Sequence, residues 1–353
     1  MGWGFCVGWG DRVFFWMSKI VDEMGTGGDG TVLVTGATGF VGAVLTRHLV
    51  EAGADVRIFR REQSSLTLLG TAAEAVEHTV GDVTHARGLY EAMDGIERVY
   101  HVAGKVSFDR REQGALRRVN ADGTANVVDA ALAAGVERLV HTSSIAALGR
   151  PLSPNTLIDE STTWEGGAHR SAYARSKRRA ELEVHRGIAE GLDAVIVNPA
   201  LVFGVGGPGT NTRRIVDAVR SGWVLGAPPG GTNVVDVQDV AAGHRAAMDR
   251  GETGERYILG GENRSWQSIL TALAEAFGID PPRRTIPPPF LKAGAALSEA
   301  VAAVTRTRPF LPRPTARTAA RTYRFDSTRA REELDCPFRA FEETACRIAE
   351  ALG

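Results

Sequence analysis

The stretch that decides the fold is Thr35-Gly36-Ala37-Thr38-Gly39-Phe40-Val41-Gly42. It follows a short apolar run at residues 31–35, which is typical of a buried strand, and it leads into a helical pattern at residues 41–52. In a strand-turn-helix unit, glycines allow the tight turn and the close approach of a pyrophosphate, which the amides at the helix N-terminus bind. Such a glycine pattern can also be a plain turn, but the flanking strand and helix favour a dinucleotide-binding loop.

Around this loop, short apolar runs alternate with helical stretches as far as Pro199. The strand candidates are residues 31–35, 55–60, 75–80, 98–103, 138–143 and 193–197. The helix candidates are residues 41–52, 86–93, 121–134 and 172–190. This alternation predicts an α/β fold with a Rossmann-type doubly wound parallel sheet, whose ligand crevice lies beyond the carboxyl ends of the strands.

After Pro199 the alternation gives way to Gly/Pro-rich loops and further helices, at residues 237–250, 265–277 and 340–351. The proline-rich residues 281–289 predict an extended connection, because proline cannot donate a backbone hydrogen bond. Residues 290–304 are expected to form an apolar helix, which suits packing, a lipophilic substrate or a membrane surface.

Three segments are therefore expected. Residues 1–30, with tryptophans among many glycines, predict a flexible, non-catalytic extension or a peripheral contact with a membrane or partner. Residues 31–200 would form the NAD(P)-binding Rossmann domain. Residues 201–353 would form a smaller C-terminal α/β lobe that binds substrate and is interleaved with the core.

The composition fits an ordinary soluble globular protein, with 43% hydrophobic and 24% charged residues. A net charge of -1 argues against a general nucleic-acid binder. No run approaches the roughly 20 apolar residues of a transmembrane helix. The three cysteines lack paired spacing and the histidines show no metal motif, so we expect a cytoplasmic protein with no metal and no disulfide framework.

The end of the second predicted strand carries Arg60 and Arg61, with Glu62 only after both. A carboxylate at this point holds the ribose hydroxyls of NAD, whereas a cation accommodates the extra phosphate of NADP. The arginines therefore favour NADP, although they would leave NAD as the cofactor if they only point to solvent.

Tyr173 and Lys177 are four residues apart on a predicted helix, so their side chains share a face. Tyrosine has an ordinary pKa near 10, and a nearby ammonium favours the phenolate. Tyr173 could then serve as the general acid or base for a carbonyl or alcohol. The spacing alone is common on helix surfaces, so its meaning depends on neighbouring groups.

One such group is expected from His141-Thr142-Ser143-Ser144, at the end of the fifth predicted strand. A hydroxyl here could hold the reacting oxygen against Tyr173. We assign this role to Ser144, with Ser143 as the alternative. A serine hydrolase is excluded because no Gly-x-Ser-x-Gly elbow surrounds either serine.

These features together resemble the extended short-chain dehydrogenase/reductase family, in its branch of dihydroflavonol 4-reductase-like, 3β-hydroxysteroid dehydrogenase-like and hopanoid-associated sugar epimerase-like proteins. The resemblance runs from about Thr31 to the C-terminus and rests on residues 35–42, 81–83, 101–104, 119–124, 198–199, 235–241 and 257–263, and on Ser144, Tyr173 and Lys177. It implies that Asp82 contacts the adenine, that residues 102–104 line the cofactor and that Lys177 also binds the nicotinamide ribose. The cofactor-binding residues that we expect are Gly36, Thr38, Gly39, Phe40, Val41, Gly42, Arg60, Asp82, Val83, Val102, Ala103, Gly104, Tyr173, Lys177 and Pro199.

The family resemblance leaves the reaction open. The first hypothesis is an NADP(H)-dependent reductase or dehydrogenase acting on a hydrophobic carbonyl compound, such as a flavonoid, steroid, terpenoid or lipid. The second is an NAD-dependent sugar or nucleotide-sugar epimerase or dehydratase, and the third is a non-catalytic dinucleotide-binding sensor. A small-molecule substrate is expected in the first two cases, and the resemblance also allows a homodimer.

Overall fold

The computed structural model describes residues 31–150, 156–164, 171–206, 210–222, 224, 226–305, 309 and 311–353. The expected N-terminal extension at residues 1–30 lies outside these ranges. Within the described residues, no helix is both long enough and apolar enough to span a bilayer.

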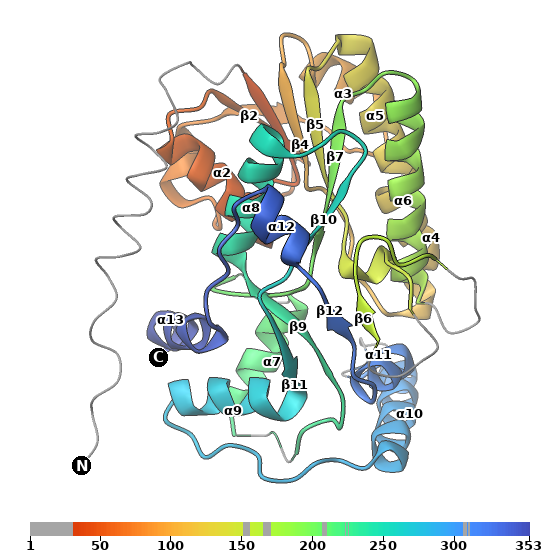
Figure 1. The fold of residues 1–353 in the computed structure, drawn as a ribbon. Helices are drawn as coiled ribbons and strands as arrows, with labels where there is room; N and C mark the ends of the chain where they lie inside the picture. The colour runs from red at the N-terminus through yellow and green to blue at the C-terminus, as the bar shows by residue number, and fades with distance from the viewer. Residues whose placement is uncertain are drawn as a thin grey trace.

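A seven-stranded parallel sheet forms the upper part of the molecule (Figure 1). Its order is β10-β7-β5-β4-β1-β2-β3. The strands are β1 (Val32–Thr35), β2 (Val56–Arg60), β3 (Glu77–Val80), β4 (Arg98–His101), β5 (Arg138–Thr142), β7 (Ala194–Pro199) and β10 (Arg256–Leu259). Because β1 pairs with both β2 and β4, the strand order reverses at the carboxyl end of β1, where doubly wound sheets bind ligands. The predicted fold class is confirmed.

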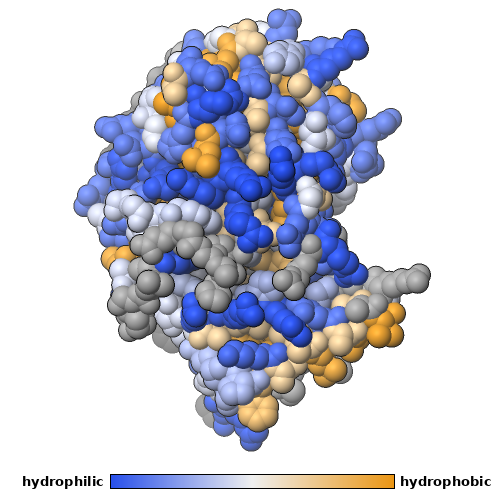
Figure 2. Space-filling view, turned by 90° about the vertical axis from the view of Figure 1, so that its right-hand side faces the viewer, coloured by the Kyte–Doolittle hydropathy of each residue, from blue (hydrophilic) through white to orange (hydrophobic). Residues whose placement is uncertain are grey.

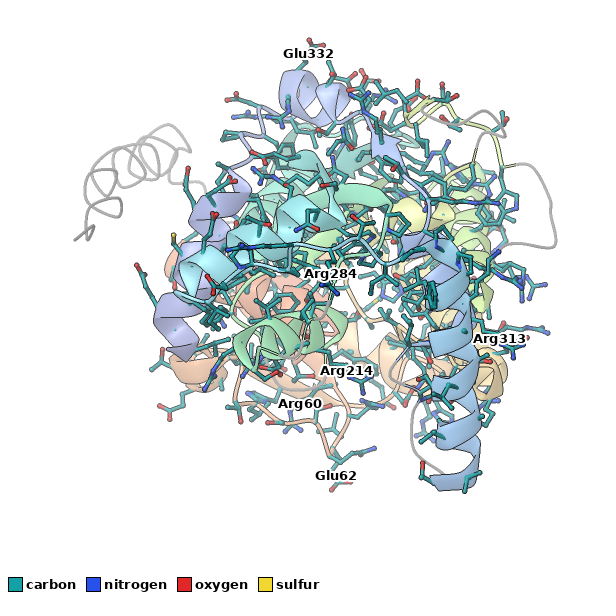
Figure 3. The ribbon with its side chains drawn as sticks, turned by 90° about the horizontal axis from the view of Figure 1, so that it is seen from below. Arg60, Glu62, Arg214, Arg284, Arg313 and Glu332 are labelled. Carbon is teal, nitrogen blue, oxygen red and sulfur yellow. The ribbon has the colours of Figure 1, made fainter. Side chains whose placement is uncertain are left out.

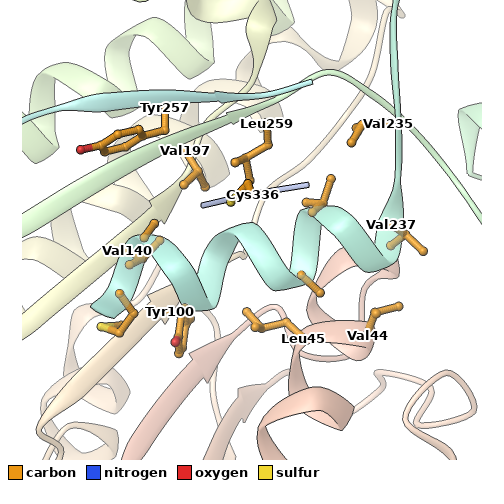
Figure 4. Close-up of a cluster of buried hydrophobic side chains, with 14 of the residues drawn as sticks. Val44, Leu45, Tyr100, Val140, Val197, Val235, Val237, Tyr257, Leu259 and Cys336 are labelled. Carbon is orange, nitrogen blue, oxygen red and sulfur yellow. The ribbon is translucent and has the colours of Figure 1, made fainter. Parts of the chain in front are cut away.

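Helices cover both faces of this sheet. One face packs against α3 (Ala86–Ala92), α5 (Gly123–Ala134) and α6 (Ala172–Ala189), and the other against α2 (Phe40–Glu51) and α8 (Val237–Arg250). Figure 4 shows α8 with Val44 and Leu45 of α2 on one side and Val197 of β7 and Leu259 of β10 on the other. Residues after 200 therefore contribute β10 to the large sheet and α8 to one of the helical layers that cover it.

The lower lobe is built on a three-stranded sheet of order β11-β9-β8. These strands are β8 (Leu201–Phe203), β9 (Gly231–Asp236) and β11 (Glu262–Ser265). A separate core around Phe203 and Phe341 joins them to α7 (Asn211–Arg220), α9 (Trp266–Ala276) and α13 (Phe341–Leu352). The remaining elements are β6 (Leu157–Ile158), β12 (Arg324–Phe325), α4 (Gln113–Arg117), α10 (Pro288–Thr305), α11 (Arg313–Ala319), α12 (Thr328–Glu333), the π-helical turn η3 (Arg118–Asp122) and the 3-10 turns η1 (Gly70–Glu74), η2 (Arg110–Glu112) and η4 (Ile145–Ala147).

One sequence-based expectation is wrong at its end. We expected residues 281–289 to be extended throughout, but Pro288 and Pro289 form the first turn of α10. The amides of a first helical turn have no partner within the helix, so proline is tolerated there.

Candidate active site

In the glycine loop, a side chain at Gly36 or Gly42 would clash with the neighbouring backbone. Gly36 has φ +74°, and a Cβ built on it would lie 2.5 Å from the backbone nitrogen of Ala103. A Cβ on Gly42 would lie 2.2 Å from the carbonyl oxygen of Gly36. Gly39 caps α2 with no side-chain hydrogen bond, which leaves the helix amides open to an anion. The loop therefore fits a bound pyrophosphate.

The ends of β1 and β4 are joined next to this loop. Val102 donates its amide to Thr35 O (3.1 Å), and Ala103 donates to Thr35 Oγ1 (3.3 Å). Gly104 lies beside Lys177, because a Cβ on Gly104 would be 3.1 Å from Lys177 Nζ. The expected cofactor residues 102–104 thus connect the glycine loop to the expected catalytic lysine.

The other expected cofactor residues lie around the same edge. Asp82 follows β3, and its carboxylate accepts hydrogen bonds from the Thr84 amide (2.9 Å) and hydroxyl (2.8 Å), which hold the pKa of Asp82 below its ordinary value. Val83 is buried beside Gly123. The Phe40 ring lies against Gly206, and Pro199 is the buried last residue of β7. Thr38 and Val41, within and just after the turn, are partly exposed.

Arg60 ends β2, as expected (Figure 3). Its Nε donates to His78 Nδ1 (2.9 Å), and its Nη1 donates to the carbonyl oxygens of Arg61 and Glu62 (3.3 Å each). Among the described residues, no carboxylate forms an ion pair with Arg60. Its positive charge is therefore available at the strand end where the adenine ribose is expected.

Tyr173, Lys177 and Ser144 meet at the ends of α6 and β5. Tyr173 and Lys177 are buried on α6, and Lys177 Nζ donates to Thr142 O (2.8 Å). Ser144 caps η4, with its hydroxyl accepting from the Ala146 amide (3.1 Å), and its side chain lies near enough to Tyr173 to influence the pKa of the phenol. The fold brings the three expected catalytic residues together.

The electrostatics differ from what the sequence led us to expect. Lys177 was expected to lower the pKa of Tyr173, but that pKa is raised, because burial disfavours the phenolate more than the nearby Ser144 hydroxyl favours it. Burial also lowers the pKa of Lys177 to about 8, while the Glu181 carboxylate opposes this shift. Because the pKa of Tyr173 is raised above its ordinary value near 10, the phenol is protonated at neutral pH.

Ser143 has a different environment from Ser144. Its hydroxyl is buried and donates to Glu181 Oε1 (2.6 Å). A hydroxyl engaged in this way within the core is poorly placed for a reacting oxygen, whereas Ser144 is only partly buried. The geometry therefore favours Ser144 over Ser143 as the hydroxyl that holds the reacting oxygen.

Sequence reasoning assigned no role to several residues of the site, although Asn120 lies within the resembling residues 119–124. Asn120 lies in the π-turn η3 and bonds both backbone groups of Lys105 (2.7 and 2.9 Å) and Ser176 Oγ (2.9 Å), which ties the loop after β4 to α6. π-Turns inside helices often mark functional sites, but the sequence gives no sign of one. The Phe108 ring packs edge-on against Tyr173, with centroids 5.9 Å apart. Glu181 could have been found from its spacing, one turn after Lys177 on the same face.

The described part of the chain contains no group of three or more His, Cys, Asp or Glu side chains arranged to hold a metal ion. The site brings together a phenol, an ammonium and a hydroxyl beside the glycine loop.

Comparisons with known proteins agree with this geometry. Residues 32–260 match the NAD dependent epimerase/dehydratase family. Sterol demethylase protein B of Methylococcus capsulatus is 37% identical over 313 residues, which cover 86% of this chain and 92% of that protein. A putative dihydroflavonol 4-reductase of Synechocystis sp. is 37% identical over 309 residues, covering 86% and 89%. The crystal structure of gox2253 is 33% identical, with TM-score 0.78, and covers 91% of this chain and 97% of that one.

Proposed function

Because the chain belongs to the NAD dependent epimerase/dehydratase family of extended short-chain dehydrogenases/reductases, and is thus an NAD(P)-dependent oxidoreductase, we propose that it is an NADP(H)-dependent reductase of hydrophobic carbonyl compounds. In the reverse direction it would oxidise the corresponding secondary alcohol. The observation that carries the proposal is the buried Tyr173 phenol, which lies beside Ser144 and one helical turn from Lys177.

Tyr173, Ser144 and Lys177 would each have a distinct role in the reaction. The pKa of Tyr173 is raised, so its phenol keeps its proton at neutral pH and can donate it to a carbonyl oxygen as a general acid. The Ser144 hydroxyl would hold that oxygen against the phenol. The Lys177 ammonium would stabilise the phenolate that remains and hold the nicotinamide ribose. The bound cofactor supplies the hydride in reduction and accepts it in oxidation.

NADP is proposed over NAD because of Arg60. The guanidinium lies at the end of β2 and bonds only to neutral groups among the described residues, so it can attract a 2′-phosphate. The use of NADP in turn favours the direction of reduction.

A hydrophobic substrate is supported by the surroundings of Tyr173. Phe108 packs on the phenol ring, and Val106 from the same loop is more than half exposed. An apolar wall beside the acid suits an apolar ketone better than a charged sugar nucleotide. One relative is named sterol demethylase protein B and another putative dihydroflavonol 4-reductase. A cytoplasmic location fits the three cysteines, whose spacing in the sequence shows no paired pattern.

The test is turnover of a ketone panel with NADPH and with NADH, together with analysis of cofactor in the purified protein. The proposal expects NADPH-dependent reduction of steroid, flavonoid or lipid ketones and no tightly held NAD. Co-purified NAD together with turnover of nucleotide sugars would instead identify an epimerase or dehydratase. Binding of a dinucleotide without turnover of any ketone or nucleotide sugar would identify a sensor.

A further inference from the structure

Helix α10 is apolar on two faces, and the described structure covers only one of them. Leu291 and Ala295 pack against Ala316 and Ala319 of α11 in a small cluster. On another face, Phe290, Leu297, Val301 and Val304 are 71, 66, 52 and 85% exposed. Their spacing of seven, four and three residues places them along one stripe of the helix.

This stripe is unusual for the molecule. Single exposed apolar residues are normal, but a contiguous stripe of large ones marks a contact surface. A shallow apolar hollow lined by Ala300, Val301, Val304 and Thr305 lies at its C-terminal end. Figure 2 shows hydrophobic residues in the lower part of the molecule, where Figure 1 places α10.

The segment around the stripe is strongly basic. Residues 281–324 hold nine arginines and lysines and one acid, Glu299, although the whole chain has a net charge of -1. The described cations of this segment are exposed: Arg283, Arg284, Lys292, Arg313, Arg317, Arg321 and Arg324. Of these, only Arg313 forms an ion pair with a described residue, Glu299 (3.1 Å). Figure 3 shows Arg313 beside α10 and Arg284 on the connection that leads to it.

We propose that the stripe Phe290, Leu297, Val301 and Val304 docks this protein on the surface of an anionic membrane, with exposed arginines of residues 281–324 contacting the lipid headgroups. An apolar helix face with basic neighbours lies in the interfacial plane, where acyl chains take the apolar side chains and anionic headgroups attract the cations. This inference concerns a surface and does not rest on the proposed reaction.

The charge argues against a second copy of the chain as the occupant. In a two-fold dimer the same patch meets itself, so the basic segments of both copies would lie close together and repel. An anionic bilayer offers the opposite charge over the whole patch.

The test is sedimentation of the full-length protein with vesicles of phosphatidylcholine alone and of equimolar phosphatidylcholine and phosphatidylglycerol. Binding is expected only to the anionic vesicles, and it should weaken as salt is added. The variant Leu297→Ser/Val304→Ser should reduce the partition coefficient at least about tenfold, because two apolar side chains lose their place in the bilayer. Arg317→Gln/Arg321→Gln should reduce it severalfold.

Matched controls are Leu182→Ser, an exposed leucine on α6, and Arg87→Gln, an exposed arginine on α3. Both should bind vesicles like the unchanged protein. Equal binding by the α10 variant and the unchanged protein would overturn the proposal, as would no binding to anionic vesicles. Light scattering of the same proteins provides the second readout: a dimer that Leu297→Ser/Val304→Ser dissociates would assign the stripe to a second copy instead.

Discussion

The Ser143 hydroxyl donates a 2.6 Å hydrogen bond to Oε1 of Glu181. The same oxygen accepts a bond from Asn198 Nδ2 (2.8 Å), which also donates to the backbone oxygen of Ser144 (3.0 Å). One buried carboxylate on α6 thus ties together the ends of β5 and β7, where Ser144 is held. Glu181 also raises the pKa of Lys177 against the effect of burial.

In Glu181→Gln, the fall of kcat/KM at alkaline pH should therefore begin at a lower pH. In the unchanged protein we expect kcat/KM for reduction to fall as pH rises through about 8, where Lys177 loses its proton. The neutral amide removes the charge that stabilises the ammonium, so the pKa of Lys177 should drop and this fall should shift to lower pH. The measurement is kcat/KM against pH, which reports groups of the free enzyme.

Glu183→Gln, which removes a partly exposed carboxylate from the same helix, is the control and should leave the profile in place. A Glu181→Gln profile that coincides with that of the unchanged protein would show that the carboxylate acts only on structure.

Tyr173→Phe should lower kcat at least about a hundredfold while leaving the dissociation constant for NADPH unchanged, because it removes the acid but keeps the ring that packs on Phe108. Stopped-flow turnover and fluorescence titration of NADPH measure the two quantities. Tyr90→Phe, at an exposed position on α3, is the control. Near-normal turnover by Tyr173→Phe would rule out the phenol as the proton donor.

The sequence predicted most of the large sheet because its strands are apolar and short and alternate with amphipathic helices. It did not reveal β11, whose residues Glu262–Ser265 carry no apolar signal and form a strand only by pairing with β9. Nor did it identify β10 as a strand, since these four residues join the sheet only after the chain has passed through β8 and β9.

For the site, the sequence predicted which side chains lie close together but not their electrostatics. The spacing of Tyr173 and Lys177 fixed their shared face, and the position of Ser144 after a strand placed it at the same edge. The directions of their pKa shifts could not be foreseen, because burial depends on the packing of α6 against α5, η3 and η4. The same holds for Asn120, whose role depends on a π-turn.

Arg60→Asp should weaken binding of NADPH relative to NADH by at least about tenfold, because a phosphate loses a cation and meets a carboxylate. Arg87→Asp makes the same change of charge at an exposed position on α3 and should leave the ratio of the two dissociation constants unchanged. Fluorescence titration with each nucleotide measures that ratio. An unaltered ratio in Arg60→Asp would refute the choice of NADP.

Three buried histidines should make the fold sensitive to acid. Burial lowers the pKa of His101 to about 3, that of His244 to about 4, and that of His141 well below its ordinary value. Below pH 6.5 the unfolded chain binds protons that the folded chain does not, so stability falls as pH drops from about 6.5 towards 4. Each histidine contributes about 1.4 kcal/mol per pH unit in this window.

His141→Leu should remove one third of this dependence. His101 and His244 hydrogen-bond Thr35 and Thr142, whereas neither ring nitrogen of His141 has a hydrogen-bond partner among the described residues. Replacing an unpaired buried imidazole by an apolar side chain of similar size should leave the free energy of unfolding at neutral pH within about 1 kcal/mol of the unchanged protein, or raise it. Urea unfolding of both proteins at several pH values between neutral and about 5 measures both effects. An equal loss of stability with acid in the two proteins would mean that His141 keeps its proton in the folded state, contrary to its burial.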